Sequence, residues 1–392
     1  MGKTILLGVT GSIAAFKAVE IARELMRRGI TVNVAMTDAA TRFVTPLTFE
    51  ALVGGRVATG LFGGERGPIP HISLADSCDA MLIAPASADS LAKLAHGLSD
   101  DIVSCTALAC AAPLVVAPAM HHNMWENQAT LCNVETLKSR GVVFVGPQTG
   151  DLASGGHGSG RMSDESDIVG TVLAVLGRTG DLHGRKVVVT AGGTQEAIDP
   201  VRCITNRSSG KMGYAVAEAA RDRGAEVLLV SAPVALRRPA CVDVVDIVSA
   251  ADMLDATREA VKNADVLIMA AAVADYRPVE PAKDKIKKDD RVEMMVALER
   301  TVDILGSLEG RYVRVGFAAE SSHLERNAQS KLADKRLDLI VGNDITARDS
   351  GFGSETNRVV FIDRQGGIER LPVLSKRDVA ERILDRVVAL LT

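Results

Sequence analysis

The chain has 392 residues, of which 47% are hydrophobic, and a formal net charge of −4 with a pI near 6.0. This length allows two domains of ordinary size. The nearly balanced charge argues against nucleic acid as a partner, and no apolar run approaches the roughly 18 residues of a membrane span. We therefore expect a cytoplasmic α/β protein that binds small anions and has neither nucleic acid nor membrane as a partner.

Short apolar strands and amphipathic helices alternate through the first half of the chain. The first strand, KTILLGV, precedes a helix from Ser12 to Arg28 and a second strand, ITVNVAM, and further strands are expected at DAMLIAPA, APLVVAPA and VVFVG. This alternation predicts a parallel sheet with helices on both faces. The glycine-rich polar segment 177–185 lacks apolar periodicity and is predicted to link two doubly wound, three-layer domains, 1–178 and 184–392.

Loops with small or polar residues follow the strands of this half. Gly11 and Ser12 form a turn after the first strand, and Ser12 is expected to cap the next helix. Thr37 follows the second strand, and the segments PASADS (85–90) and PAMHHNMW (118–125) follow two later ones. Because the carboxyl ends of parallel strands share one edge, these loops are predicted to converge on one ligand crevice.

Five motifs, GSIAAFK, HISLA, PASADS, PAMHHNMW and GSGRM, occur in this order. Together they resemble the flavin-dependent phosphopantothenoylcysteine decarboxylases. The resemblance implies a flavodoxin-like domain that binds FMN and converts 4′-phosphopantothenoylcysteine to 4′-phosphopantetheine. In this family FMN transiently oxidises the cysteine end of the substrate, which eases loss of carbon dioxide, and the net redox change is zero.

The resemblance also assigns roles to residues of this chain. His71, in the HISL context, matches the base beside the flavin, although a lone histidine is more often structural. The implied FMN-binding residues follow the strand ends and are Gly11, Ser12, Thr37, Ser87, Ala119 and Met120.

Two positions depart from the family pattern. His121 stands where the family usually has asparagine; its ring can still donate to the substrate carboxylate, with Asn123 as a second contact. Ser154 stands where the family usually has a cysteine that protonates the enethiolate, and a serine hydroxyl is a much weaker acid than a thiol. His157 is an alternative donor. These departures leave open a flavin-binding regulatory module without turnover.

The second half repeats the alternation with KVVVT, AEVLLV, ADVLIMAAA, YVRVGFAAE and LDLIVGN, and then predicts an antiparallel pair, NRVVFID and GIERLP, before a terminal helix. This pattern predicts a second, Rossmann-like sheet. A long polar loop follows Val187–Val189, and Ser208, Ser209 and Gly210 open a helix whose N-terminus favours phosphate. Six cysteines form no C-x-x-C pair, and most are expected in the core.

The motifs TAGGTQEAIDPVRCITNRSSGKMG, AAAVADYRP, KDKIKK, VGFAAE and GND resemble phosphopantothenate–cysteine ligase over residues 187–363. The resemblance implies that the carboxylate of 4′-phosphopantothenate attacks the α-phosphate of CTP, and that the amine of L-cysteine then displaces CMP. Mg²⁺ is the implied metal. ATP remains open as the nucleotide.

The resemblance assigns two catalytic residues in this half: Asn206 holds the acyl-cytidylate and Lys285 serves the second step. Ser208, Ser209 and Gly210 are expected to bind a ligand phosphate. Asp275 is the candidate for cytidine or Mg²⁺, and the other nucleotide contacts are expected at Lys285, Phe317, Lys331 and Lys335.

The two resemblances together imply a bifunctional enzyme of coenzyme A synthesis. The flavin domains of the family form trimers and the ligase domains form dimers, which together predict a closed homododecamer. Two further alternatives rank below this one. A nicotinamide-dependent reductase would need the absent G-x-G-x-x-G and Y-x-x-x-K motifs, and a decarboxylase of peptide cysteines would not need the fused ligase.

Overall fold

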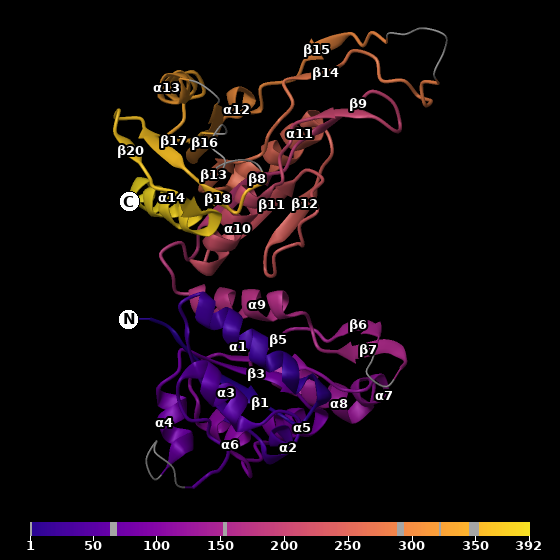
Figure 1. Cartoon of the computed structure of the whole chain (residues 1–392), viewed down its shortest axis with the longest axis vertical. Coiled ribbons are helices and arrows are strands. Elements are labelled where there is room, and N and C mark those ends of the chain that lie inside the picture. The colour runs from indigo at the N-terminus through magenta and orange to yellow at the C-terminus, as the bar shows by residue number, and fades with distance from the viewer. Residues whose placement is uncertain (1, 63–68, 152–154, 288–293, 321–322, 345–352) are drawn as a thin grey trace. The chain divides into compact units, whose positions relative to one another are not determined.

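The computed structural model describes residues 2–62, 69–151, 155–287, 294–320, 323–344 and 353–392. The chain divides into two compact units, Met1–Leu176 and Gly177–Thr392 (Figure 1). Each unit has its own sheet and its own core.

The strands of the first unit are β1 (Thr4–Val9), β2 (Thr31–Met36), β3 (Ala80–Ala86), β4 (Leu114–Pro118), β5 (Val143–Phe144), β6 (Gln148–Asp151) and β7 (His157–Arg161). Its helices are the 3₁₀ helix η1 (Ile13–Phe16), α1 (Lys17–Arg27), α2 (Asp38–Thr41), α3 (Pro46–Val53), α4 (Pro70–Asp76), α5 (Ala88–His96), α6 (Ile102–Ala109), α7 (His122–Trp125) and α8 (Gln128–Ser139), with α9 (Glu165–Gly177) at its end.

The main sheet of the first unit has the strand order β2-β1-β3-β4-β5, and every neighbouring pair is parallel. This is the flavodoxin order, in which the direction of winding reverses between β1 and β3. β6 and β7 form a separate antiparallel hairpin. The predicted flavodoxin-like domain is confirmed.

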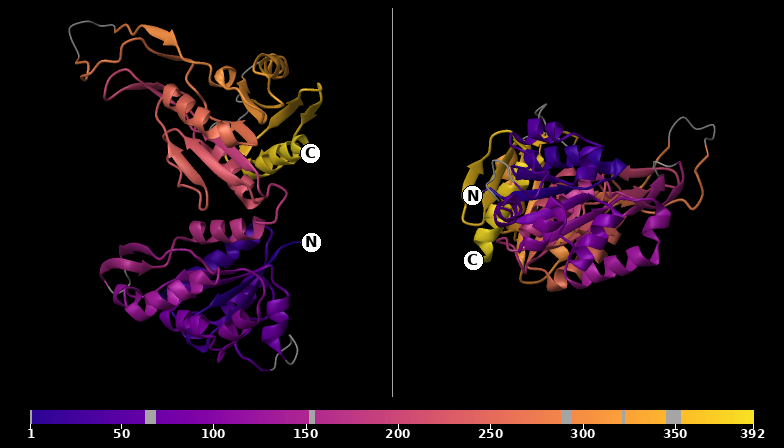
Figure 2. Two further views of the ribbon diagram at one scale, coloured as in Figure 1. Left: turned by 180° about the vertical axis from the view of Figure 1, so that it is seen from behind. Right: turned by 90° about the horizontal axis from the view of Figure 1, so that it is seen from below.

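Helices cover both faces of this sheet (Figure 2). Ile5, Leu7 and Val9 of β1 join the core under α1, α3 and α9, whereas Leu6 joins the core under α4, α5, α6 and α8. Successive side chains of a strand point to opposite faces. A strand buried on both faces therefore reads as the continuous apolar run that the sequence shows.

The strands of the second unit are β8 (Lys186–Ala191), β9 (Gln195–Ala197), β10 (Cys203–Thr205), β11 (Glu226–Ser231), β12 (Asp243–Asp246), β13 (Val266–Met269), β14 (Tyr276–Pro278), β15 (Leu298–Arg300), β16 (Val313–Glu320), β17 (Leu339–Asp344), β18 (Thr356–Asn357), β19 (Val359–Asp363), β20 (Ile368–Arg370) and β21 (Leu374–Ser375). Its helices are α10 (Lys211–Asp222), α11 (Ala250–Ala260), the 3₁₀ helix η2 (Val261–Asn263), α12 (Ile304–Ser307), α13 (Leu324–Asp334) and α14 (Lys376–Leu391).

The large sheet of this unit has the order β12-β11-β8-β13-β16-β17-β19-β20. The first six strands are parallel and follow the Rossmann order 3-2-1-4-5-6. β19 and β20 continue the sheet antiparallel, as the sequence predicts. α10 and α14 pack on one face, and α11, α12 and α13 pack on the other, so the three-layer, Rossmann-like prediction is confirmed.

An arm of short strands extends from this unit (Figure 1). It consists of the antiparallel pair β9–β10 and the antiparallel pair β14–β15. Several large apolar side chains on or beside the arm are exposed, among them Val201 at 64%, Val279 at 48% and Leu298 at 45%. Exposed apolar side chains gathered on one element mark an interaction surface.

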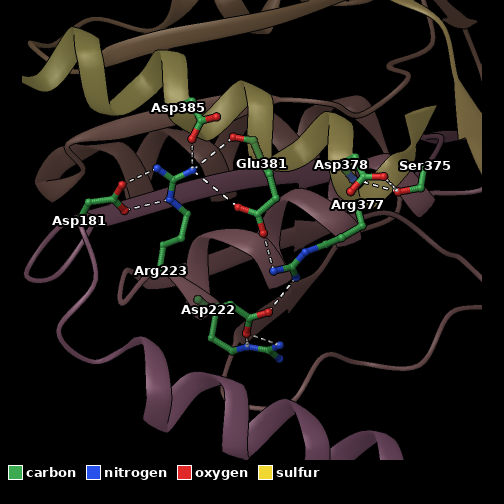
Figure 3. Close-up of polar contacts among 9 residues, drawn as sticks. Asp181, Asp222, Arg223, Ser375, Arg377, Asp378, Glu381 and Asp385 are labelled. Atoms are coloured by element: carbon green, nitrogen blue, oxygen red, sulfur yellow. Dashed lines mark hydrogen bonds and ion pairs between the residues drawn. The ribbon is translucent and has the colours of Figure 1, made fainter. Parts of the chain in front are cut away.

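The C-terminal helix α14 is held to the end of α10 by two arginines (Figure 3). Arg223 donates to Asp181 (Nε–Oδ1, 2.9 Å) and to Asp385 (Nη1–Oδ1, 2.8 Å). Arg377 donates from Nη1 to Oδ2 of Asp222 at 2.7 Å. Asp181 lies just before β8, at the start of the second unit, and α14 lies at its end. This network therefore fixes both ends of the second unit to α10.

The cysteines are all free thiols, and none is fully buried. Cys132, Cys203 and Cys241 are exposed, so the expectation that most cysteines lie in the core is wrong. Cys78 and Cys110 follow α4 and α6 and place their sulfurs 3.5 Å apart. Within the described ranges, every helix is too short or too polar to cross a membrane.

Candidate functional site

A cavity of about 480 Å³ opens at the carboxyl edge of the first sheet. The turns after β1, β3 and β4 and the end of β7 form its wall. Its lining includes Gly11, Ser12, Ser87, Ala119, Met120 and Met162. This is the position at which a flavodoxin-order sheet binds its ligand.

Close backbone packing positions these turns. A Cβ on Gly11 would lie 2.6 Å from the Cβ of Ala39, so only glycine allows the β1 turn to approach α2. Thr10 Oγ1 donates to the carbonyl of Pro85 at 2.8 Å and accepts from the N–H of Ser87 at 3.0 Å. This buried hydroxyl fixes the β1 turn to the β3 turn.

Ser12 is the N-cap of η1, as predicted, and accepts from the N–H of Ala14 at 3.3 Å. Its hydroxyl also lies 3.4 Å from the carbonyl oxygen of Ala119, to which it donates. One residue thus connects the turn after β1 with the loop after β4. Ser87 caps α5 in the same way by accepting from the N–H of Ser90.

The lining suits a flavin. Ile13, Ala119, Met120 and Met162 supply apolar contacts for a flat ring, while capped helix starts at Ser12 and Ser87 supply groups for a phosphate. Gly160 has φ 120°, and a Cβ there would lie 2.3 Å from the carbonyl oxygen of Met120. The cavity wall is therefore set by a position that only glycine fills without strain.

The structure places five of the six predicted flavin residues around this cavity: Gly11, Ser12, Ser87, Ala119 and Met120. Thr37 does not line it. Instead Thr37 is buried and caps α2, accepting from the N–H of Ala40 at 3.2 Å. Its contribution is to hold α2, the helix against which Gly11 packs.

His121 lines the cavity and caps α7. Its Nδ1 accepts from the N–H of Asn123 at 3.3 Å. A neutral imidazole that accepts at Nδ1 carries its proton on Nε2, so Nε2 is the donor available to a substrate carboxylate. Asn123 itself is exposed and does not line the cavity.

His71 lies on α4 and is not among the residues that line this cavity. Its Nδ1 is buried and has no hydrogen-bond partner among the described residues. The exposed side chains of Ile69 (51%) and Ile72 (42%) flank it. The motif predicts that His71 belongs to the site, but His71 does not line the cavity within the described residues of one chain.

The β6–β7 hairpin carries the expected proton-donor loop. Ser154 lies outside the described residues. His157, the alternative donor, begins β7, is exposed and places Nδ1 3.1 Å from Asp151 Oδ1. Gly160, Arg161 and Met162, which follow it, line the cavity, so the hairpin leads directly into the wall.

A second cavity, of about 870 Å³, opens at the carboxyl edge of the second sheet. The loop between β10 and α10, the loop after β13 and residues 317–319 of β16 line it, and β8 and β13 flank the switch point of this sheet. The predicted residues Asn206, Ser208, Ser209, Gly210, Asp275 and Phe317, together with Lys331 and Lys335, line it. The structure thus brings together residues spread over more than a hundred positions of sequence.

Asn206 joins two of these loops. Its amide nitrogen donates to the carbonyl oxygens of Val273 at 2.9 Å and Ala272 at 3.4 Å. Gly210 then caps α10 with φ 75°, a left-handed conformation that suits glycine. The loop between β10 and α10 is therefore held against the strand end that carries Asp275.

Two lysines at α13 form a cationic flank. Lys331 Nζ donates to the carbonyl oxygen of Phe317 at 2.8 Å, and Lys335 forms an ion pair with Asp303. Burial opposes ionisation of Asp303, but the hydrogen bond from Lys335 prevails and lowers the pKa of this carboxyl. Within the described residues, no group of three or more His, Cys, Asp or Glu side chains forms a ready metal site.

Lys285 lies on the arm and not among the residues that line this cavity. The next residue, Ile286, donates its N–H to Asp199 Oδ2 at 3.2 Å, and Arg202 donates to the carbonyl oxygen of Ile286 at 3.1 Å. The hydrogen bond from Arg202 holds the pKa of the buried Asp199 carboxyl well below its usual range. These contacts fix the Lys285 segment beside the β9–β10 hairpin.

Sequence reasoning missed further polar residues of this cavity, among them Lys211, Asn357 and Lys376. Lys211 directly follows the SSG motif, so its place at the start of α10 gave a usable signal. Asn357 and Lys376 lie in the last strands and at the start of the terminal helix, where the sequence has no motif to mark them. In the first unit it also missed Thr10, which joins the turns after β1 and β3 and which a predicted strand end could have indicated.

The folds and cavities define a class: a two-unit α/β protein with a flavin-type site in the first unit and a separate anion-binding site in the second. Family comparisons agree. Residues 1–177 match the model described as "Flavoprotein", and residues 182–391 match "DNA/pantothenate metabolism flavoprotein C-terminal domain".

Curated relatives match along the whole chain. The coenzyme A biosynthesis bifunctional protein CoaBC of Bacillus subtilis (strain 168) is 43% identical, over 99% of this chain and 97% of the relative. The protein of that name from Escherichia coli (strain K12) is 41% identical over 99% and 97%. A crystal structure of the C-terminal domain of a CoaBC protein is 42% identical, covers 54% of this chain and 98% of its own, and has a TM-score of 0.47.

The chain belongs to the family of bifunctional coenzyme A biosynthesis proteins. The expectation of a flavoprotein fused to a ligase, with lyase and ligase activities in one chain, is confirmed.

Proposed function

We propose that this chain ligates 4′-phosphopantothenate to L-cysteine with CTP and then decarboxylates 4′-phosphopantothenoylcysteine to 4′-phosphopantetheine. The observation that carries the proposal is the pairing of an apolar cavity at a flavodoxin switch point with a lysine-bearing cavity at a Rossmann switch point. We place the two activities in domains 1–178 and 184–392. The six free cysteines suit an enzyme of the reducing cytoplasm.

FMN is the proposed cofactor of the first cavity, held by Gly11, Ser12, Ser87, Ala119 and Met120. When bound it would supply the transient oxidation that makes loss of carbon dioxide easy. The protein would supply the proton transfers and orientation. His121, with its proton on Nε2, would donate to the substrate carboxylate, and His71 would act as base.

A second copy of the chain is proposed to bring His71 to the cavity. Ile13 and Phe16, each 59% exposed, line the cavity, while the exposed Ile69 and Ile72 are close neighbours of His71 in the sequence. Joining these two apolar surfaces is a head-to-tail contact, the kind that closes a ring such as a trimer. The final protonation would fall to Ser154 or to His157 on the same hairpin.

The second cavity is proposed to hold both substrates of the ligation. Asn206 would orient the acyl group, and Lys331 and Lys335 would bind the nucleotide phosphates. The exposed Asp275 would share Mg²⁺ with phosphate oxygens, since Mg²⁺ is commonly held by one or two carboxylates plus substrate. Lys285 would assist the attack of the cysteine amine on the acyl-cytidylate once the arm places the Lys285 side chain beside a cavity that holds this intermediate.

The apolar arm of the second unit is the proposed twofold contact. Val201, Val279 and Leu298 would be covered by the same surface of a second copy. Trimers of the first unit and dimers of the second would then close a dodecamer. Native mass measurement should give twelve times the 41.3 kDa chain; a monomer would contradict the shared sites.

Omission of cysteine tests the ligase part directly. Purified protein given 4′-phosphopantothenate, CTP and Mg²⁺ should release pyrophosphate and accumulate an acyl-cytidylate detectable by mass spectrometry. Adding L-cysteine should release CMP, and Lys285→Gln should slow only this second phase. Equal rates with ATP and CTP would contradict the assignment of CTP as the specific nucleotide. Pyrophosphate release that requires cysteine would refute the two-step scheme.

A further inference from the structure

Lys376 is a buried lysine at the start of α14. Only 6% of its surface is exposed, and its Nζ donates to Oδ1 of Asn357 at 2.7 Å. Asn357 is itself 3% exposed. Lysine is almost never buried to this extent, because desolvation of its ammonium group is costly. A lysine that accepts this cost beside a cavity is a candidate for ligand binding.

A second lysine raises that cost. Burial, reinforced by the nearby charge of Lys211, lowers the pKa of Lys376 to about 8, and Glu355 opposes the shift. Lys211 is the first residue of α10; its Nζ donates to the carbonyl of Gly353 at 3.1 Å and forms an ion pair with Glu355. Both lysines line the cavity, so a bound anion would meet two ammonium groups there, one of them paired with Glu355.

This pair of lysines is separate from the lysines of α13. α10 and α14 pack on one face of the sheet, whereas α13 packs on the other face. Lys211 and Lys376 therefore approach the cavity from one flank, and Lys331 and Lys335 approach it from the opposite flank. A single cavity with two cationic flanks suits a reaction between two phosphorylated substrates.

We propose that Lys376, with Lys211, binds the phosphate monoester of the acid substrate, opposite the flank that binds the nucleotide triphosphate. This assignment rests on the proposed ligase function and deepens it. The monoester is a compact dianion near pH 7, and it matches two adjacent ammonium groups beside the start of α10, where Ser208–Gly210 line the same wall.

The test replaces each lysine by methionine, which keeps the length of the side chain and removes its charge. Lys376→Met should raise the KM for 4′-phosphopantothenate about 10- to 100-fold, the usual range for a lost charged hydrogen bond, and leave the KM for CTP within about threefold. Lys335→Met should do the reverse. Lys186→Met, on an exposed lysine paired with Glu226, should change neither KM.

Removing the phosphate from the ligand gives a second readout. Pantothenate, which lacks the monoester, should bind the wild-type protein and Lys376→Met equally weakly in a competition assay. A Lys376→Met variant that weakens CTP instead, or weakens pantothenate as much as 4′-phosphopantothenate, overturns the proposal. Unchanged values for both substrates overturn it as well.

A binding test with inorganic phosphate keeps the proposal testable if Lys376→Met does not fold or if the ligase function is wrong. Phosphate should raise the unfolding temperature of the wild-type second unit, and Lys211→Met, at a side chain that is 27% exposed, should reduce this shift even if Lys376→Met does not fold. A shift that Lys335→Met removes and Lys211→Met leaves intact contradicts the assignment. A wild-type protein that shows the expected phosphate shift but no ligation would refute the ligase function alone.

Discussion

The cavity of the first unit is bounded mainly by apolar and glycine residues, whereas the cavity of the second unit is nearly twice as large and carries lysines from α10, α14 and the α13 region. The first is shaped by close backbone contacts such as that of Gly160 with Met120. The second is shaped by charge. A flat cofactor is selected by steric fit, and a pair of polyanions by cations, so steric changes should disable the first site and charge changes the second.

The largest effect is expected from His71→Asn. Removing a general base costs about 10²- to 10⁴-fold in rate, so carbon dioxide release should fall by that factor while CMP release stays unchanged. Phosphopantothenoylcysteine should accumulate in a mass-resolved assay. Equal loss of both activities would show that the two sites are not independent.

Mixed oligomers sharpen this prediction. His71→Asn chains co-expressed with chains whose flavin cavity is blocked should regain part of the decarboxylase activity, because an intact His71 would meet an intact cavity across the contact. No recovery in verified mixed oligomers would assign His71 to its own chain.

A steric change at Gly160 is expected to release the flavin. Gly160→Ala adds a Cβ that would lie 2.3 Å from the Met120 carbonyl oxygen, at φ 120°. Strain of this kind costs about 1 to 3 kcal/mol, so flavin affinity, read from bound absorbance, should fall about tenfold or more. Ligation should be unaffected. Gly156→Ala, where nothing lies within 4 Å, is the matched control and should retain flavin.

A charge effect should appear in the pH dependence of the second site. The pKa of Lys376 is lowered to about 8 by burial and by Lys211, against the pull of Glu355. The phosphate needs the protonated lysine, so the KM for 4′-phosphopantothenate should be constant between about pH 7 and pH 8, where the monoester is a dianion, and rise above pH 8 by up to about tenfold per unit. Lys376→Met should abolish this rise. A rise that persists in the variant would assign it to another group.

Much of both folds could be predicted from the sequence, because parallel strands buried on two faces leave long apolar runs separated by helices and polar turns. The antiparallel pair β19–β20 was also predictable. Five of the six residues predicted for flavin binding line the first cavity because they follow strand ends, which share one edge. Thr37 follows a strand end too, yet it caps α2 and does not line the cavity, a difference that strand position cannot reveal.

Residues that act through distant packing could not be predicted. Lys376 reaches the second cavity only because α14 packs against α10, and nothing near it in the sequence signals this contact. His71 and Lys285 were selected by motif, but neither is among the residues that line the first or the second cavity in the described part of one chain. A motif identifies the residue type, and assembly determines where that residue acts.

The smallest effect concerns stability and tests whether the units are independent. Arg223→Ala removes contacts with Asp181 and Asp385 from a side chain that is 15% exposed, although its partners are about half exposed. We expect a loss of about 1 to 2 kcal/mol and a decrease of a few degrees in the unfolding temperature of the second unit. The temperature at which the first unit releases its flavin should not change. Arg238→Ala, from a fully surface pair with Asp246, should change neither transition.

The most direct measurement is complete turnover by the flavin-loaded wild-type protein with 4′-phosphopantothenate, L-cysteine, CTP and Mg²⁺, followed by mass spectrometry and carbon dioxide release. Formation of 4′-phosphopantetheine with one carbon dioxide and one CMP per product is the predicted result. Accumulation of phosphopantothenoylcysteine by protein with full flavin content would contradict the claim that both sites are catalytic, and would leave the first unit as a flavin-binding module beside an active ligase.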